Sequence, residues 1–173
     1  MRALGAARRG GAWLLALPWL WAACGQEAPE GSSGQLAAEV EHLQAVLLSD
    51  VYHSADRHVR AALESDLPAR AAALLEREVA PAARLQLQAV EEMSPSTERG
   101  RELRALALSR LEARLGTVRE YARVLARGPV EDLRLVDAMR SRREAELGIV
   151  GLLEQLDAIH PLPSSEPPVE PAR

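Results

Sequence analysis

The chain has 173 residues, the length of a single domain, and a formal charge of −4 in which every basic residue other than histidine is arginine. It contains no Phe, all three Trp lie within the first 21 residues, and Tyr52 and Tyr121 are its two tyrosines. Such a chain lacks the stacking platforms and the basic surface with which proteins bind nucleic acid, so we expect no nucleic-acid partner.

Residues 1–23 have the organisation of a secretion signal. Three arginines come first, and residues 12–23 form an apolar run that is shorter than the roughly 20 residues a membrane-spanning helix needs. Two alanines then precede Cys24, the only cysteine in the chain. The pattern indicates export across a membrane, and the adjacent Arg8 and Arg9 leave the twin-arginine route open beside the general one.

Residues 1–25 resemble the precursors of bacterial lipoproteins, in which a lipobox places small residues before an invariant cysteine. The resemblance implies that the thiol of Cys24 is lipidated and that cleavage makes Cys24 the first mature residue, although Trp21 stands where an aliphatic residue is usual. An ordinary secreted protein cleaved after Gly25 is the alternative, but a lone thiol is uncommon in an oxidising compartment. Removing residues 1–23 takes three of the 21 basic residues and none of the 25 acidic ones, which leaves a formal charge of −7.

The residue after the cysteine indicates whether the lipid anchor lies in the inner or the outer membrane. In Gram-negative lipoproteins an aspartate at that position retains the protein at the inner membrane, so Gly25 implies an outer-membrane lipid anchor with the folded part in the periplasm. Secretion and an inner-membrane anchor are the alternatives. The order of signal, tether, alanine- and arginine-rich helices and proline-rich tail also resembles small helical lipoproteins of GC-rich Gram-negative bacteria such as myxobacteria, a resemblance that implies no activity.

Four amphipathic helices are predicted between a flexible tether and a disordered tail. Residues 24–35 contain Gly, Ser, Pro and Glu without apolar periodicity and predict the tether, whereas residues 161–173 contain five prolines and predict the tail. Between them, residues 36–160 show apolar positions spaced by three or four, which is typical of helices that bury one face.

The first helix is expected from Leu36 to about Ser65, with Asp66 capping the second helix and Pro68 in its first turn. The second helix is expected to kink at Pro81, because proline removes a backbone hydrogen bond while the apolar phase continues across it. The predicted buried positions of the first helix are Leu36, Val40, Leu43, Leu47, Val51, Ala55, Val59 and Ala62, and those of the second are Ala71, Leu74, Leu75, Val79, Ala82, Leu85, Ala89 and Met93.

The third helix is expected to open with Ser94 as its N-cap and Pro95 as its first residue, and Gly128 with Pro129 ends it and opens the fourth. Residues 160–161 end the fourth helix. The predicted buried positions of the third helix are Leu103, Leu106, Ala107, Leu111, Leu115, Val118, Ala122 and Leu125, and those of the fourth are Leu133, Val136, Met139, Leu147, Val150, Leu153 and Leu156.

Long helices with short connections predict an all-α fold, an antiparallel up-down four-helix bundle whose second helix is kinked at Pro81. Gly148 and Gly151 lie inside the fourth helix, where each glycine costs helix stability relative to alanine. We expect them to mark a close crossing with the first helix, opposite Leu43 and Leu47.

No residue pattern indicates an enzyme, a metal or a cofactor. Glu39 and His42 form one Glu-x-x-His half-motif of the kind that di-iron bundles use, but the chain has no second copy of it. Asp50 and His53 are three residues apart, a spacing that could serve a metal but is also that of an exposed ion pair. The chain has no glycine-flanked serine nucleophile and no glycine-rich phosphate loop. We therefore expect a non-enzymatic protein without catalytic, cofactor-binding or metal-binding residues.

Charge is distributed unevenly between two predicted helices. Residues 35–66 carry six acidic side chains against two arginines, and residues 98–127 carry eight arginines against four glutamates. Opposite the apolar stripe, an i, i+4 ladder is formed by Arg119, Arg123 and Arg127. Repulsion between these like charges costs roughly a few tenths of a kcal/mol per pair unless acidic side chains neutralise them. Salt bridges to neighbouring helices are one interpretation, and docking to anionic headgroups or an acidic envelope protein is the other.

Together these observations predict a lipid-anchored, non-enzymatic envelope protein that acts as an interaction or scaffold module. Its partners would be membrane lipid through Cys24 and an acidic surface through the arginine ladder. A periplasmic bundle that binds a small ligand or a metal is the alternative. Self-association through helices is a third interpretation, and the oligomeric state stays open.

Overall fold

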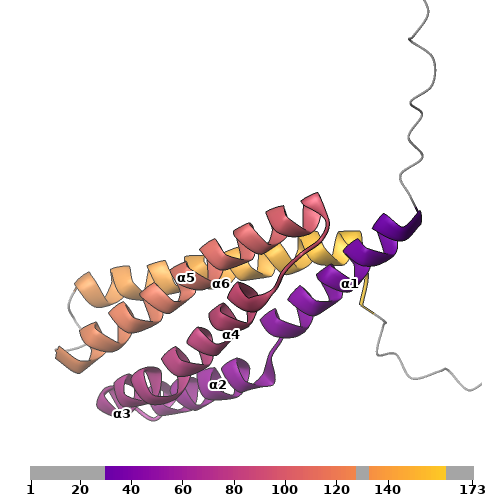
Figure 1. Ribbon diagram of the computed structural model, residues 1–173. Helices are drawn as coiled ribbons and strands as arrows, with labels where there is room; N and C mark the ends of the chain where they lie inside the picture. The colour runs from indigo at the N-terminus through magenta and orange to yellow at the C-terminus, as the bar shows by residue number, and fades with distance from the viewer. Residues whose placement is uncertain (1–29, 128–132, 163–173) are drawn as a thin grey trace, which may run out of the picture.

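A computed structural model describes residues 30–127 and 133–162, and every regular element in these ranges is helical, which confirms the predicted all-α class for them (Figure 1). No helix of this part of the chain is long and apolar enough to cross a membrane. The predicted signal, Cys24 and the tail from residue 163 lie outside the described residues. The elements are α1 (Glu30–Leu47), α2 (Asp50–Glu64), α3 (Pro68–Leu74), the π-helix η1 (Leu75–Val79), α4 (Ala80–Glu92), α5 (Glu98–Arg127) and α6 (Leu133–Ile159).

The buried apolar side chains form two clusters. One joins α2, α3 and η1 to the second half of α5 and to the start of α6, through residues such as Val59, Leu75 and Val118. The other joins α1 and the end of α4 to the first half of α5 and to the second half of α6, through residues such as Leu43 and Ile149.

The predicted first helix is two helices. Helix α1 begins at Glu30, so residues 30–35, which were predicted to belong to the tether, are helical. It ends at Leu47, and the chain turns at Ser49, with φ −51° and ψ 122°, before α2 begins (Figure 1). The side-chain amide of Gln86 in α4 donates to the carbonyls of Val46 at 2.9 Å and of Leu47 at 3.3 Å. A residue 40 positions away thus bonds the carbonyls at the end of α1, where the N–H of Ser49 also donates to Val46 at 3.3 Å.

The predicted second helix is an unbroken helical run that changes type before its proline. It passes from α3 through η1 into α4, and Pro81 is the second residue of α4. In the π-helical segment the N–H of Ala80 bonds to the carbonyl of Leu75. The register therefore changes directly before the residue that cannot donate a backbone hydrogen bond. The kink at Pro81 stays a prediction.

The connection between α2 and α3 does not use Asp66 as a cap, contrary to expectation. Leu67 is the residue before α3, with no side-chain cap hydrogen bond, and Pro68 is confirmed in the first turn. Asp66 has a positive φ of 55°. Its N–H bonds to the carbonyl of Leu63, and the N–H of Leu67 bonds to that of Ala62. This is a Schellman ending of α2 with Asp66 in the left-handed conformation.

The start of α5 also differs from the prediction of Ser94 and Pro95. The helix begins at Glu98, and Thr97 caps it, since the N–H of Gly100 donates to the Thr97 hydroxyl at 2.9 Å. The carboxylate of Glu39 in α1 accepts from the backbone N–H of Ser96 at 2.6 Å and of Thr97 at 3.1 Å. Both hydroxyls also donate to it. Thr97 is therefore the N-cap of α5, and an acceptor from α1 holds the two residues that precede the helix.

The predicted close crossing at Gly148 and Gly151 is absent. A Cβ atom added at Gly151 would meet nothing within 4 Å, and one added at Gly148 would meet only the flexible side chain of Arg110, at 3.2 Å. Beyond the end of α6, the amide of Gln44 in α1 donates to the carbonyl of His160 at 3.2 Å.

Candidate functional site

The sequence-predicted site residues fall in two groups. Cys24 lies outside the described residues. Arg119, Arg123 and Arg127 are exposed on α5, as the helical periodicity predicted. Arg123 forms an ion pair with Glu120 of the same helix. Arg119 and Arg127 form no ion pair with any described residue, so within that part of the chain this ladder makes no salt bridge to a neighbouring helix.

The histidines and the acidic residues near them in the sequence lie in different surroundings. Glu39 caps α5, while His42 on the same helix is exposed. The ring of His53 meets the edge of the Tyr52 ring at 5.8 Å, and Nδ1 of His58 lies 2.9 Å from a carboxylate oxygen of Glu78. Within residues 30–127 and 133–162, no three His, Cys, Asp or Glu side chains are grouped so that they could hold a metal ion.

A polar layer separates the two apolar clusters of the core. Arg114 of α5 is 1% exposed, and its guanidinium carbon lies 4.1 Å from the centre of the Tyr52 ring. The guanidinium donates to the side-chain oxygen of Gln86 at 3.0 Å and to Glu146 of α6 at 2.7 Å. The Tyr52 hydroxyl donates to the other carboxylate oxygen of Glu146 at 2.5 Å. Through Gln86 the layer reaches the break between α1 and α2.

A second set of ionic contacts continues the polar layer. The buried Asp56 accepts from Arg60, one turn later in α2, at 2.9 and 2.7 Å. Its other carboxylate oxygen accepts from Arg142 of α6, whose guanidinium carbon lies 5.4 Å from the centre of the Tyr121 ring. These charges are partnered with one another, which is the condition under which buried charges are tolerated.

The polar layer links four helices through its side chains. Burial raises the pKa of Tyr52 despite the opposing charge of Arg114, and the hydrogen bond to Glu146 raises it further. Tyr52 therefore stays protonated at neutral pH and serves as a donor. In the described residues, Nε of Arg114, Nε of Arg142 and Oε1 of Gln44 are buried without a partner. Since the remaining groups are paired, the layer holds α2, α4, α5 and α6 in one register.

The outer face of α6 carries apolar side chains that the core does not cover. Five large apolar side chains lie exposed on it, and the exposed fraction reaches 80% at Leu133 and 58% at Leu147. We call these five residues the α6 face: Leu133, Val136, Met139, Leu147 and Val150. All five were predicted to be buried, and for them the prediction was wrong, whereas Leu156 of the same predicted set is fully buried.

The reason for this error is that α6 has two apolar faces. The side chains that it buries are Leu135, Ala138, Ile149, Leu152 and Leu156. Each set repeats at helical spacing, and the two lie on opposite sides of the helix. Helical periodicity alone cannot decide which side meets the core. The presence of a second apolar set was the signal in the sequence for an additional contact surface.

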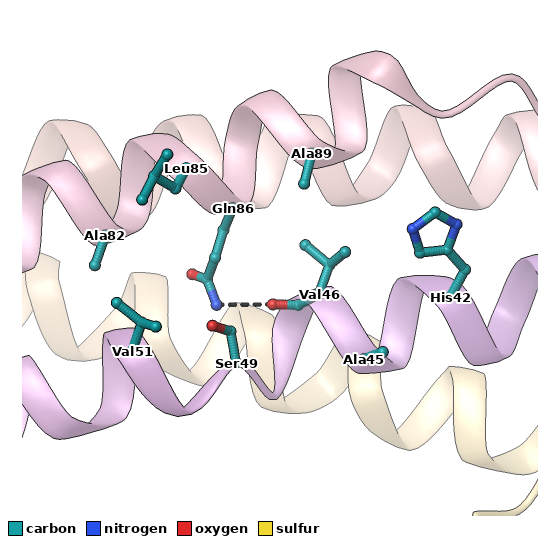
Figure 2. A pocket seen from close by; sticks show the side chains of 9 residues that line it. All are labelled: His42, Ala45, Val46, Ser49, Val51, Ala82, Leu85, Gln86 and Ala89. Atoms are coloured by element: carbon teal, nitrogen blue, oxygen red, sulfur yellow. Dashed lines mark hydrogen bonds between the residues drawn. The ribbon is translucent and has the colours of Figure 1, made fainter.

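A shallow groove lies at the break between α1 and α2 (Figure 2). Its volume is about 340 Å³, and Gln86 reaches across it from α4 to the carbonyl of Val46. Val51 and Leu85 line it and are each 61% exposed, although both were predicted to be buried. The remaining lining residues are His42, Ala45, Ser49, Ala82 and Ala89.

Comparison of the chain with protein-family models, with curated proteins and with solved structures gives no match in any of the three. In its described residues the chain combines an all-helical fold, a polar layer in the core and an unpartnered apolar face on α6.

Proposed function

We propose that the mature chain is a lipid-anchored, non-enzymatic interaction module of the cell envelope, attached through Cys24 to the outer membrane with its helices in the periplasm. The short basic and apolar signal followed by a single cysteine supports the anchor. The observation that carries the proposal is the α6 face, because a helix that is apolar on two opposite sides is typical of one that is covered on both.

We further propose that the described helices form the antiparallel up-down bundle, with α1 and α2 together as one arm and a bend at Pro81. The connections from α2 to α3 and from α4 to α5 are short, and the helices they join pack against each other. The first half of α5 shares a cluster with the second half of α6, which supports opposite directions for these two helices. The π-helical segment before Pro81 supports a local bend.

The anchor is tested by feeding cells radiolabelled fatty acid. We expect label in the wild-type protein and none in Cys24→Ser, which should also be released from the membrane fraction. The mature protein should show no tryptophan fluorescence, because all three Trp precede Cys24. An unlabelled, soluble wild-type protein that retains its Trp would refute the anchor.

The interaction face is tested by crosslinking and purification from detergent-solubilised envelopes. The double variant Leu147→Gln/Val150→Gln should lose the partner that wild type retains. Both side chains are about half exposed, so the substitutions leave the core intact. The matched control is Leu67→Gln, a comparably exposed leucine in the turn before α3. Equal recovery with all three proteins would remove the α6 face from the proposal.

A second candidate function is binding of a small apolar ligand in the groove of Figure 2, and the exposed Val51 and Leu85 favour it. Native mass spectrometry of the purified protein tests it. A bound molecule that is lost in Leu85→Arg would support this function, and a bare polypeptide mass for the wild type would count against it.

A further inference from the structure

The exposed side of α6 changes in charge along its length in a way that fits a reversed copy of itself. Six exposed positions, spaced by three or four residues, follow one another: Arg140, Arg143, Leu147, Val150, Glu154 and Asp157. The first two are basic, the middle two are apolar and the last two are acidic. A helix with this order is complementary to the same helix running in the opposite direction.

From this order we infer that the partner of the C-terminal part of the α6 face, Leu147 and Val150, is a second copy of the chain, with the two α6 helices packed antiparallel about a two-fold axis. The inference rests on the proposed function and names its partner. Leu147 of each copy lies against Val150 of the other, and Arg143 lies against Glu154. One turn further out, Arg140 lies against Asp157. The two-fold axis forms each of these pairs twice.

Other registers of the two helices are disfavoured by charge. A shift of one heptad places Arg143 against Leu147, so that a charge faces an apolar side chain. A shift of two heptads pairs Val136 with Leu147 but places Arg140 against Arg143 on both sides of the axis. A parallel pair in register places every charged residue against its own copy. Because like charges in contact repel, the first register is the one that the sequence of α6 selects.

The charged side chains are available for these pairs. Arg143 and Glu154 form no hydrogen bond or ion pair with any described residue. Arg140 lies 3.5 Å from Asp137, and both of those side chains are mostly exposed. Asp157 accepts one hydrogen bond, from the N–H of Leu162 at 3.1 Å. Each of the four can therefore turn to a second copy without leaving a buried partner unpaired.

The centre of the contact is also open. A Cβ atom at Gly151 would meet nothing within 4 Å, so no side chain of the same copy blocks approach there. From Arg140 to Asp157 the helix is about 26 Å long, so the contact is at the small end of specific interfaces. We expect a dissociation constant in the micromolar range. Lipid anchoring at a shared surface would raise the effective concentration of the two copies.

The experiment is sedimentation equilibrium on the chain from residue 24 with Cys24→Ser, which contains every described residue and cannot form a disulfide. This protein should show concentration-dependent dimers. Arg143→Glu and Glu154→Arg should each weaken the dimer by about tenfold or more, because each variant places like charges at both copies of the pair. An equimolar mixture of the two variants should dimerise again, since both pairs are then of opposite charge. The matched control is Arg84→Glu, at an exposed arginine of α4, which should dimerise as the parent does.

Several outcomes would overturn the inference. A protein that is monomeric at all concentrations would overturn self-association. A dimer that neither charge reversal weakens, or a mixture that does not recover, would overturn the register. If the chain is monomeric while Leu147→Gln/Val150→Gln still abolishes retention of a different envelope protein, the proposed function stands and only this inference fails. Circular dichroism of each variant checks that the helices are intact.

Discussion

The guanidinium of Arg114 lies over the ring of Tyr52, and both side chains hydrogen-bond the same carboxylate of Glu146. These residues come from α5, α2 and α6, so one acidic group ties three helices together at the level where the core divides. Arg114 is almost fully buried, whereas the side chain of Glu146 is 33% exposed. Loss of the carboxylate would therefore leave the more deeply buried charge without its counter-ion.

We expect Glu146→Gln to lower the free energy of unfolding by about 2–4 kcal/mol, because breaking a buried ion pair leaves an uncompensated charge. Urea denaturation at neutral pH measures this. The matched control is Glu144→Gln, an exposed glutamate of the same helix, for which we expect a change within about 0.5 kcal/mol. Equal free energies of unfolding for the two variants would show that the ion pair does not stabilise the fold. The double variant Arg114→Met/Glu146→Leu should recover part of the loss.

The buried tyrosines make the fold sensitive to alkali. Burial raises the pKa of Tyr52 and of Tyr121 above the ordinary value of 10. The unfolded chain therefore loses phenolic protons first, so this contribution to stability is complete below pH 10 and is lost as the pH rises toward the folded pKa values.

In the protein without residues 1–23, the phenolate absorbance should rise together with loss of the helical circular dichroism signal. Tyr52→Phe should make the free energy of unfolding less dependent on pH above about pH 10. Phenolate that appears with its ordinary midpoint while the helices stay intact would show that the tyrosines are accessible, contrary to their burial.

The contribution of Glu39 to stability should be lost in acid, whereas that of the tyrosines is lost in alkali. Burial by itself would raise the pKa of Glu39, but hydrogen bonds from Thr97 and Ser96 outweigh it and lower the pKa below 4.5. The contribution is therefore present above the unfolded pKa and is lost as the pH falls through the folded value. We expect Glu39→Gln to be less stable by about 1 kcal/mol at neutral pH. The difference from wild type should disappear in acid, and a difference that is constant with pH would contradict the role of the charge.

The contacts of Glu39 and Thr97 at the start of α5 leave little room for a side chain at Gly100. A Cβ atom there would lie 1.9 Å from a carboxylate oxygen of Glu39 and 2.8 Å from the hydroxyl oxygen of Thr97. Gly100→Ala should therefore destabilise the protein although alanine is the better helix former by about 1 kcal/mol. In the Glu39→Gln background the penalty should be smaller, since the cap is already weakened. Thermal unfolding of the four proteins forms the double-mutant cycle, and strict additivity would refute the link.

Asp66 offers a stabilising substitution. Its φ of 55° is in the left-handed region, where glycine has no steric cost. Asp66→Gly should raise the free energy of unfolding by about 0.5–1 kcal/mol, and Asp66→Ala should lower it or leave it unchanged. The two variants are compared by thermal denaturation, and a more stable alanine variant would contradict the Schellman ending.

Local periodicity predicted much of the helical structure. The buried positions of α5 are largely those that the apolar spacing indicated, from Leu103 to Leu125. Pro68 begins a helix as its backbone geometry predicts. The polar layer was not foreseen, although Arg114 stands between Leu111 and Leu115 on the apolar side of α5, and that position was the signal that it is buried.

By itself, the amino-acid sequence determined that residues 36–127 and 133–159 are mostly helical and that α5 buries one continuous stripe, because these properties depend on neighbours within a few positions. Only the tertiary structure decided the break at Ser49, the start of α5 and the choice between the two apolar faces of α6. Each of these depends on groups that are distant in the chain: Gln86 bonds the end of α1, Glu39 caps α5, and the apolar clusters cover just one side of α6. Periodicity describes which faces a helix has, but packing against other helices selects the face that is buried.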